Sequence, residues 1–280
     1  MKTYQPMNQA NTCNIFIYTA LPCEAKPLVA HFNLKKDTTV QPFAVYSNQA
    51  IRLTVTGPGK NAMAAGIAYT QALFAATEHP IMLNIGIAGH KDHALGSLFL
   101  IDKLIDLDSG RTHYPPMICH PPCATGSLQT ASKPQLGYDH PHLCDMEASA
   151  FYETAVRFSS AELIQCLKVI SDNRQTPAEN IAPDQVSALM AAHIPAIEGL
   201  LADMTALAQL ITPSEPRLFK QLVQQYHFTA SERGRLKTQL CRWQVLTDNK
   251  EPAFDATGMQ RGKDVLHWLD RQISQIDFCL

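Results

Sequence analysis

Short apolar runs and longer amphipathic stretches alternate along most of the chain. Continuous apolar runs predict buried strands, because a strand covered on both faces is hydrophobic without alternation; these lie at 14–19, 81–87 and 163–171. Helical spacing of apolar residues predicts long helices at 61–76, 146–157 and 184–210, the last kinked at Pro195. Shorter elements are expected at 24–32 (helix), 43–46, 51–55, 98–101, 104–107 and 127–131. This order predicts an α/β fold, a three-layer sandwich with a central mixed β-sheet flanked by helices.

The pattern changes after the proline-rich segment 212–216. From there on only helical spacing is found, at 218–226, 231–243 and 262–276, and Thr229 with Glu232 fits a capping box for the second helix. The sequence therefore predicts two domains, an α/β domain at 13–211 and a helical C-terminal extension at 212–280.

Composition narrows the class of protein. The chain has 280 residues, 46% hydrophobic and 17% charged, with a formal net charge of −2, which is typical of a globular protein without a nucleic-acid footprint. Basic residues at 233, 235, 237 and 242 fit a solvated helix face better than a nucleic-acid contact. No apolar run approaches the roughly 20 residues of a membrane helix, and no secretory pattern opens the chain. We expect a cytoplasmic protein without a membrane partner, its eight cysteines reduced.

Two glycine-containing turns follow predicted strands, at 56–62 and 86–89. Backbone N–H groups at the first turn can hold an anion or a polar substrate group, although a tight turn alone explains its glycines equally well. Small residues in the second turn let a ligand approach the backbone closely. Glu24, Glu147 and Asp172 lie near the ends of predicted strands or the start of predicted helices. Taken singly, each of these acids can equally be a surface, first-turn or capping residue.

The stretch 109–143 is a long connection rich in Pro, His and Cys. Its histidines and cysteines raise the possibility of zinc, but their spacings do not match a paired-cysteine site, so no metal is expected. We interpret it as a loop that closes over a ligand, with Gln129, Thr130 or Tyr138 among the candidate contacts.

Five pieces together resemble the nucleoside phosphorylase and nucleosidase superfamily, particularly its methylthioadenosine/S-adenosylhomocysteine nucleosidase branch. They are Thr19-Ala-Leu-Pro-Cys-Glu-Ala25, Thr56-Gly-Pro-Gly-Lys-Asn-Ala62, Asn84-Ile-Gly-Ile-Ala-Gly89, Asp145-Met-Glu-Ala148 and Ile170-Ser-Asp172. They occur in the family order, and the resemblance covers about residues 13 to 205. It implies cleavage of the N-glycosidic bond of a purine nucleoside or thionucleoside.

The resemblance also implies roles for individual residues. Glu147 would hold the ribose hydroxyls, and Met146 would pack against the sugar. Asp172 would protonate or hydrogen-bond the purine, and Glu24 would hold the attacking water. The remaining substrate-binding residues implied are Ile87, Ala88, Gly89 and Ser171.

The chemistry agrees with these residue types. Cleavage builds positive charge on the sugar and negative charge on the leaving base, so one carboxylate can favour the cation while a carboxylic acid supplies the proton. Three positions depart from the resemblance: Ile87 replaces a usual Ser, Lys168 replaces a usual Arg, and Asn173 replaces a usual acidic residue.

These observations leave three functions open. Glu24 stands where phosphorylases of the superfamily place Arg, so the first is a nucleosidase using water, without a cofactor. The second is a phosphorylase using orthophosphate as co-substrate, for which Lys26, Lys60 or Arg52 could serve the phosphate. The third is a nucleoside-binding protein that kept the fold without turnover. The resemblance also implies a homo-oligomer, a dimer or higher.

Overall fold

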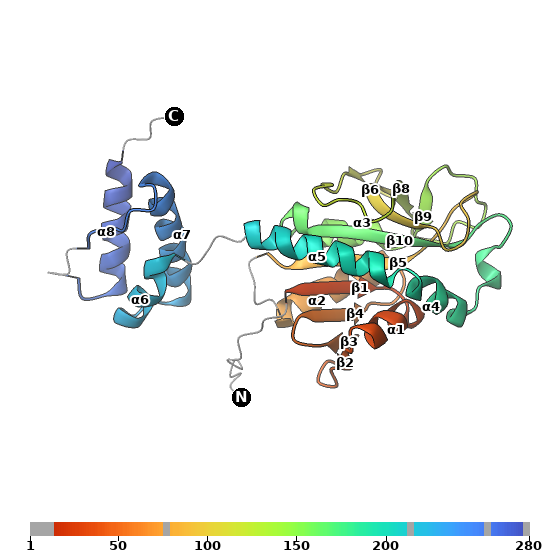
Figure 1. Cartoon of the computed structure of the whole chain (residues 1–280), viewed down its shortest axis with the longest axis horizontal. Coiled ribbons are helices and arrows are strands. Elements are labelled where there is room, and N and C mark those ends of the chain that lie inside the picture. Colours follow the sequence, from red (N-terminus) through yellow and green to blue (C-terminus); the bar gives the residue numbers. More distant parts are fainter. Residues whose placement is uncertain (1–13, 75–78, 212–215, 255–258, 277–280) are drawn as a thin grey trace. The chain divides into compact units, whose positions relative to one another are not determined.

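The computed structural model describes residues 14–74, 79–211, 216–254 and 259–276. The chain divides into two compact units, Met1–Thr212 and Pro213–Leu280 (Figure 1). Each unit has its own buried apolar core. The predicted domain start at residue 13 and the predicted end of a helix at residue 76 lie outside the described residues.

One mixed β-sheet organises the first unit. Its strands follow the order β10-β6-β8-β9-β5-β1-β4-β3-β2, with β7 on β6. Their bounds are β1 Ile15–Thr19, β2 Lys35–Lys36, β3 Ala44–Ser47, β4 Ile51–Val55, β5 Ile81–Gly89, β6 Leu98–Asp106, β7 Thr112–His113, β8 Ala124–Thr130, β9 Leu143–Asp145 and β10 Ile164–Asp172. Because β10 pairs with both β6 and β5, five strands close into a ring at one half of the sheet.

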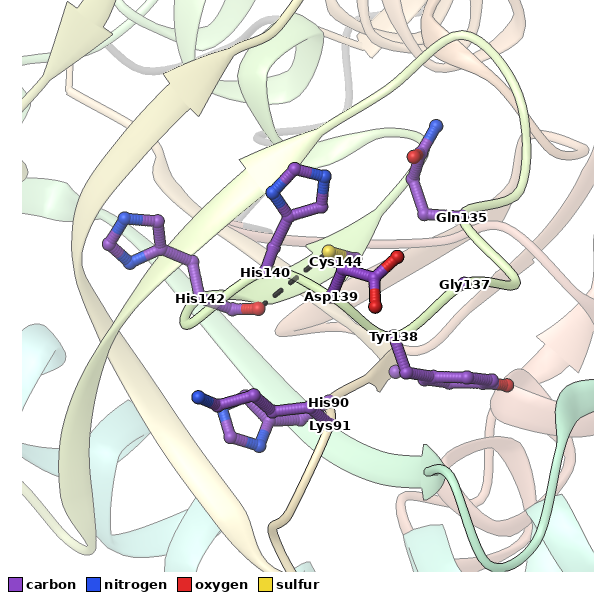
Figure 2. Close-up of a pocket in the computed structure, with 10 residues that line it drawn as sticks. His90, Lys91, Gln135, Gly137, Tyr138, Asp139, His140, His142 and Cys144 are labelled. Atoms are coloured by element: carbon purple, nitrogen blue, oxygen red, sulfur yellow. Dashed lines mark hydrogen bonds between the residues drawn. The ribbon is translucent and has the colours of Figure 1, made fainter.

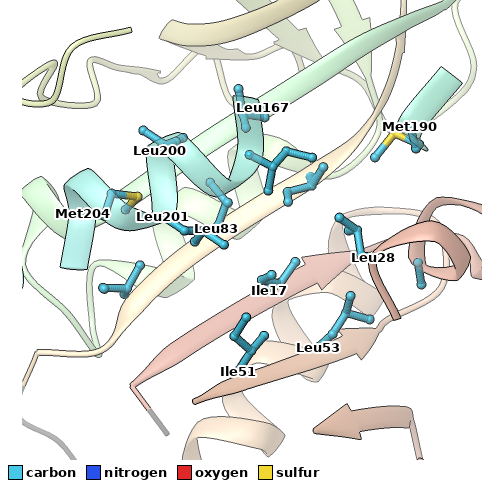
Figure 3. Close-up of a cluster of buried hydrophobic side chains, with 14 of the residues drawn as sticks. Ile17, Leu28, Ile51, Leu53, Leu83, Leu167, Met190, Leu200, Leu201 and Met204 are labelled. Atoms are coloured by element: carbon cyan, nitrogen blue, oxygen red, sulfur yellow. The ribbon is translucent and has the colours of Figure 1, made fainter. Parts of the chain in front are cut away.

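Helices cover both faces of this sheet, as the sequence predicts. Their bounds are α1 Pro22–His31, α2 Lys60–Phe74, α3 Ala148–Ala155, α4 Pro183–Ala191 and α5 Ile194–Ile211. Ile17 of β1 joins a core with Leu28 of α1 and Leu200 of α5 (Figure 3). Its neighbour Phe16 belongs to a second core with Phe151 of α3. Successive strand residues point to opposite faces, so one strand contributes to both cores.

Several element boundaries differ from the prediction for local reasons. The expected helix at 184–210 is two helices, α4 and α5, and Pro195 lies in the first turn of α5, where a missing N–H costs nothing. The two expected strands at 98–101 and 104–107 are one continuous β6. The helix α3 begins at Ala148, so that Glu147 is its N-cap. Strands β2, β7 and β9 have two or three residues, too short for a periodic pattern.

The second unit contains the helices α6 Arg217–Gln225, α7 Ala230–Leu246 and α8 Gly262–Gln275. The N-terminus of α7 has the predicted capping box: the Glu232 N–H donates to the Thr229 hydroxyl at 3.3 Å, and the Thr229 N–H donates to the Glu232 carboxylate at 2.8 Å. Apolar residues of all three helices form its core, among them Leu222, Leu236 and Leu266.

Helix α5 is long and apolar enough, by length and composition alone, to cross a membrane. Its residues Ile197, Leu200 and Met204 are buried against the sheet of the first unit. Length and composition do not distinguish a membrane span from a helix that packs on a sheet, and 28% of this helix is buried inside the structure.

Candidate active site

A cavity of about 180 Å³ lies at the carboxyl ends of the parallel strands β1, β5 and β10. Ligands of open α/β sheets bind at this edge, where loops follow the strands. The described residues that line the cavity are Ala20, Leu21, Glu24, Pro58, Ile87, Ala88, Gly89, Pro134, Gln135, Leu136, Cys144, Asp145, Met146, Glu147, Ser171, Asp172 and Ala178. The structure therefore brings all eight site residues expected from the resemblance to one cavity.

Glu24 stands in the first turn of α1, directly after β1, and only 2% of it is exposed. Its Oε2 accepts hydrogen bonds from the N–H groups of Ala20 and Leu21, both at 2.8 Å, and its Oε1 accepts one from Ile87 at 2.9 Å. Burial raises the pKa of Glu24, while Lys168 and these N–H groups oppose the rise. Because Oε1 accepts a single one of these bonds, it keeps acceptor capacity for a water molecule.

Lys168 is a buried cation near the candidate site, and only 1% of it is exposed. It lies on β10 opposite Gly86 of β5. Its Nζ lies 2.9 Å from Asp145 Oδ2. A Cβ on Gly86 would lie 2.9 Å from Glu24 Oε1 and 3.3 Å from Lys168 Nζ, so the glycine leaves room for both charged groups beside β5. Burial alone would lower the pKa of Lys168, but Asp145 and Glu147 raise it above its usual range, so the side chain stays charged.

Glu147 occupies the N-cap position of α3, and its side chain reaches toward the loop before α2 rather than capping the helix. Its Oε1 accepts the Gly59 N–H at 2.7 Å, and its Oε2 accepts the Met146 N–H at 3.3 Å. Burial, together with the charge of Asp145, raises the pKa of Glu147 to about 7, against the lowering effects of Lys168 and the Gly59 N–H. Close to neutral pH this carboxyl therefore exchanges between its protonated and ionised forms.

Asp172 ends β10 and is held by two hydroxyls. Its Oδ1 accepts the Ser171 hydroxyl, and its Oδ2 accepts the Tyr138 hydroxyl at 2.8 Å. A Cβ on Gly89 would lie 2.5 Å from Oδ2, so the end of β5 must be glycine for this carboxylate to fit. Each oxygen keeps room for one further hydrogen bond.

The three residues that depart from the resemblance make different kinds of contact. Ile87 binds Glu24 through its backbone N–H, which a serine would also supply, and its side chain packs against an apolar core. Lys168 makes one ion pair with Asp145 in place of a planar fork. The side chain of Asn173 shapes the turn after β10: its Nδ2 donates to the His93 carbonyl at 2.9 Å, and its Oδ1 accepts the Thr176 N–H at 2.9 Å.

The sequence does not identify Asp145 as the partner of Lys168. The prediction of which residues of the stretch 109–143 reach the site is only partly right. Of the three candidate contacts in 109–143, Tyr138 reaches Asp172, whereas Gln129 and Thr130 do not line the cavity. Thr130 instead donates to Asp145 Oδ1 at 2.7 Å. A carboxylate directly before Met146-Glu147 on a short strand, with a lysine inside an apolar strand, was the available signal for this ion pair.

A second, smaller cavity of about 40 Å³ adjoins the first and shares Gly89, Gln135 and Cys144 with it (Figure 2). The rest of its lining consists of His90, Lys91, Gly137, Tyr138, Asp139, His140 and His142. His90 holds the end of the loop: its Nδ1 accepts N–H bonds from Asp92 and His93, which leaves Nε2 to donate to the Pro141 carbonyl at 3.3 Å. Within the described part of the chain, no group of three His, Cys, Asp or Glu side chains is arranged for a metal.

The three cations that could serve a phosphate, Lys26, Lys60 and Arg52, do not line the larger cavity. The Lys60 Nζ is 2.9 Å from Asp106 Oδ2 and also contacts Asp108. Lys26 pairs with Asp184 at 3.4 Å on the surface. The Arg52 guanidinium stacks 3.8 Å from the centre of the Phe74 ring. No Lys or Arg is present among the described residues that line the larger cavity.

No family model and no curated protein matches this sequence. Solved structures do match it. A 5′-methylthioadenosine/S-adenosylhomocysteine nucleosidase from S. pneumoniae, solved with a transition-state inhibitor, aligns with a TM-score of 0.53 and 20% identity over 69% of this chain and 99% of its own. The 5′-methylthioadenosine nucleosidase of Arabidopsis thaliana aligns with a TM-score of 0.55 and 17% identity over 69% and 96%.

A futalosine hydrolase mutant from Helicobacter pylori aligns with a TM-score of 0.51 and 13% identity over 68% of this chain and 98% of its own. Nearly the whole of each of these proteins is thus matched by about two-thirds of this chain. The chain has their fold, a mixed sheet flanked by helices, as the resemblance in sequence predicts.

Proposed function

We propose that this protein cleaves the N-glycosidic bond of a purine nucleoside or thionucleoside, with water as the nucleophile. The observation that carries the proposal is the convergence of four carboxylates, Glu24, Asp145, Glu147 and Asp172, on one cavity at the strand ends. The names of the matched structures, two nucleosidases and a futalosine hydrolase, support hydrolysis as the reaction class.

The reaction divides the carboxylates by position. Ionised Glu147 accepts hydrogen bonds from the ribose hydroxyls and favours the positive charge that develops on the sugar. Asp172, held by Ser171 and Tyr138, meets the leaving base and supplies or shares the proton that it needs, an effect typically worth about 10²–10⁴-fold. Glu24 Oε1 holds and orients the attacking water.

Water rather than phosphate is favoured by the charges around the cavity. Its described lining contains carboxylates and no Lys or Arg, and a cavity of this kind repels orthophosphate. Lys168, a buried cation, is paired with Asp145 at 2.9 Å. We therefore propose hydrolysis without a cofactor, with a small nucleoside as the partner molecule. A cytoplasmic location and a homo-oligomer of two or more copies remain predictions.

Incubation with inosine, adenosine and methylthioadenosine, with and without orthophosphate, tests the proposal. We expect release of free base at the same rate in both conditions, measured by chromatography, with the free sugar as the second product. Strict dependence on phosphate, with a sugar 1-phosphate as product, would contradict hydrolysis and favour the phosphorylase.

The substitution Asp172→Asn separates an enzyme from a protein that only binds nucleosides. It is expected to lower kcat by at least about 10²-fold, because the amide cannot supply the proton, while calorimetry still detects nucleoside binding. Wild-type protein that binds these nucleosides without releasing base would establish the non-catalytic alternative.

A further inference from the structure

Tyr138 connects two segments that are far apart in sequence. It belongs to the loop 131–142, between β8 and β9, and its hydroxyl donates to Asp172 Oδ2 at 2.8 Å. The same hydroxyl accepts the N–H of Ala178, from the segment after β10, at 2.9 Å. One phenol therefore joins the loop, the carboxylate and the segment 173–182, and Ala178 itself lines the larger cavity.

The backbone of Tyr138 adopts a conformation that bulky residues rarely take. Its φ is +50°, in the left-handed region. Such a conformation persists where surrounding contacts determine it, and it concentrates at functional sites. Here the contacts are the two hydrogen bonds of the hydroxyl and, three residues later, the bond from His90 to the Pro141 carbonyl.

The phenol remains a donor through the neutral pH range. Burial, together with the hydrogen bond to Asp172, raises the pKa of Tyr138 to about 12. In Figure 2 its ring points away from the imidazoles of His140 and His142. Tyr138 thus lines the small cavity, while its hydroxyl donates to Asp172 at the end of β10.

We propose that Tyr138 is a positioning residue, which fixes the orientation of Asp172 toward the leaving base and ties the loop 131–142 to the segment after β10. This inference rests on the proposed function, because it assigns Tyr138 a part in the departure of the base. It differs from a general role in packing, since the hydroxyl, and not the ring, carries it.

The test compares Tyr138→Phe with wild type on two substrates. A purine nucleoside needs a proton on its leaving base, whereas 4-nitrophenyl riboside releases a stabilised phenolate that needs none. We expect Tyr138→Phe to lower kcat for the purine nucleoside about tenfold with KM within about twofold, and to leave kcat for the nitrophenyl riboside unchanged. Tyr46→Phe removes a hydroxyl from β3, near the other edge of the sheet, and is the matched control with wild-type kinetics.

A second variant removes a single hydrogen bond and keeps the tyrosine. Ala178→Pro deletes the N–H that the hydroxyl accepts, and the preceding Pro177, at φ −64° and ψ 154°, already has the backbone that a following proline requires. We expect the same selective loss in kcat, about threefold. If Tyr138→Phe fails to fold by circular dichroism, Ala178→Pro carries the test.

The outcomes distinguish failure of the role of Tyr138 from failure of the proposed hydrolysis. Wild-type kcat for the purine nucleoside in both variants would overturn the role of Tyr138 and leave hydrolysis standing. Equal losses on both substrates would also overturn it, because they indicate a general collapse of the cavity. Wild-type protein that releases no base from any nucleoside would overturn the proposed function and this inference together.

Discussion

The carboxylates of the candidate site are held by two different kinds of donor. Glu24 is bound by three backbone N–H groups, which remain in place when the neighbouring side chains change. Asp172 depends on the hydroxyls of Ser171 and Tyr138, so single substitutions can release it. The position of Glu24 is therefore a property of the fold, whereas the position of Asp172 is a property of particular side chains.

Glu147 makes the free energy of unfolding depend on pH. Its pKa is raised from 4.5 to about 7 in the folded protein, so the folded state binds a proton that the unfolded state releases. The resulting stabilisation is fully present below about pH 4.5 and is lost as the pH rises through about 7. Relative to wild type, Glu147→Gln should therefore gain stability over this window, by up to about 3 kcal/mol.

Urea unfolding of both proteins at pH 5 and pH 7.5 measures this effect. A difference in the free energy of unfolding that stays constant with pH would show that Glu147 is ionised throughout. Ionisation of Glu147 should also make nucleoside binding tighter as the pH rises through about 7, because the ionised carboxylate is the acceptor for the sugar hydroxyls.

At the scale of elements, the pairing of β5 with β10 brings the charged groups together. Lys168 of β10 lies opposite Gly86 of β5. The register then shifts between Ile170 and Asp172, so that Asp172 pairs with Gly89 at the carboxyl end of β5. Both glycines leave room for a carboxylate from another segment. A larger residue at Gly86 or Gly89 would therefore occupy the space that these charged groups fill.

Gly86→Ala should damage this arrangement. The added Cβ would meet Glu24 Oε1 and Lys168 Nζ, both buried, and overpacking of this kind costs typically about 1–3 kcal/mol. Gly199→Ala is the matched control, because nothing lies within 4 Å of its Cβ on the exposed side of α5, and alanine should stabilise the helix by about 0.5–1 kcal/mol. Thermal unfolding compares the two; equal midpoints would contradict the close approach at Gly86.

At the scale of the whole molecule, the chain combines two units with separate cores. About 69% of this chain matches 96–99% of the length of each of the two nucleosidases. The remaining third of this chain therefore has almost no counterpart in those proteins. The second unit buries Leu236, Leu266 and Leu269 among its own helices. It therefore has the apolar interior that an independent domain requires.

Residues 213–280 alone should fold into a helical domain with a cooperative thermal transition by circular dichroism. Leu266→Ala should abolish that transition, because removing a buried leucine costs typically about 2–5 kcal/mol, comparable with the whole stability of so small a domain. Val245→Ala, on α7 and 80% exposed, should leave it unchanged. A fragment without a cooperative transition would show that the second unit depends on the first.

The sequence predicts the fold class because its long strands are continuous apolar runs, and the motifs place the eight site residues near strand ends. It does not predict the ion pair of Lys168 with Asp145, since that contact depends on how β10 and the three-residue strand β9 each pair with β5. Nor does it predict how Tyr138 reaches Asp172, because a left-handed backbone at a non-glycine residue leaves no periodic pattern. The roles of the eight residues remain predictions; Asp172→Asn tests that of Asp172, and the pH dependence of nucleoside binding tests that of Glu147.

The loop 131–142 has a consequence for how new substrate preferences could arise or be engineered. It supplies Pro134, Gln135 and Leu136 to the cavity and borders the acid that ends β10, while Glu24 and Glu147 come from other segments. Changes confined to one exposed surface loop can therefore alter what fits beside Asp172 without disturbing the other two acids. A library randomised at 134–136 with Tyr138 retained is the compact starting point for directed evolution of this scaffold.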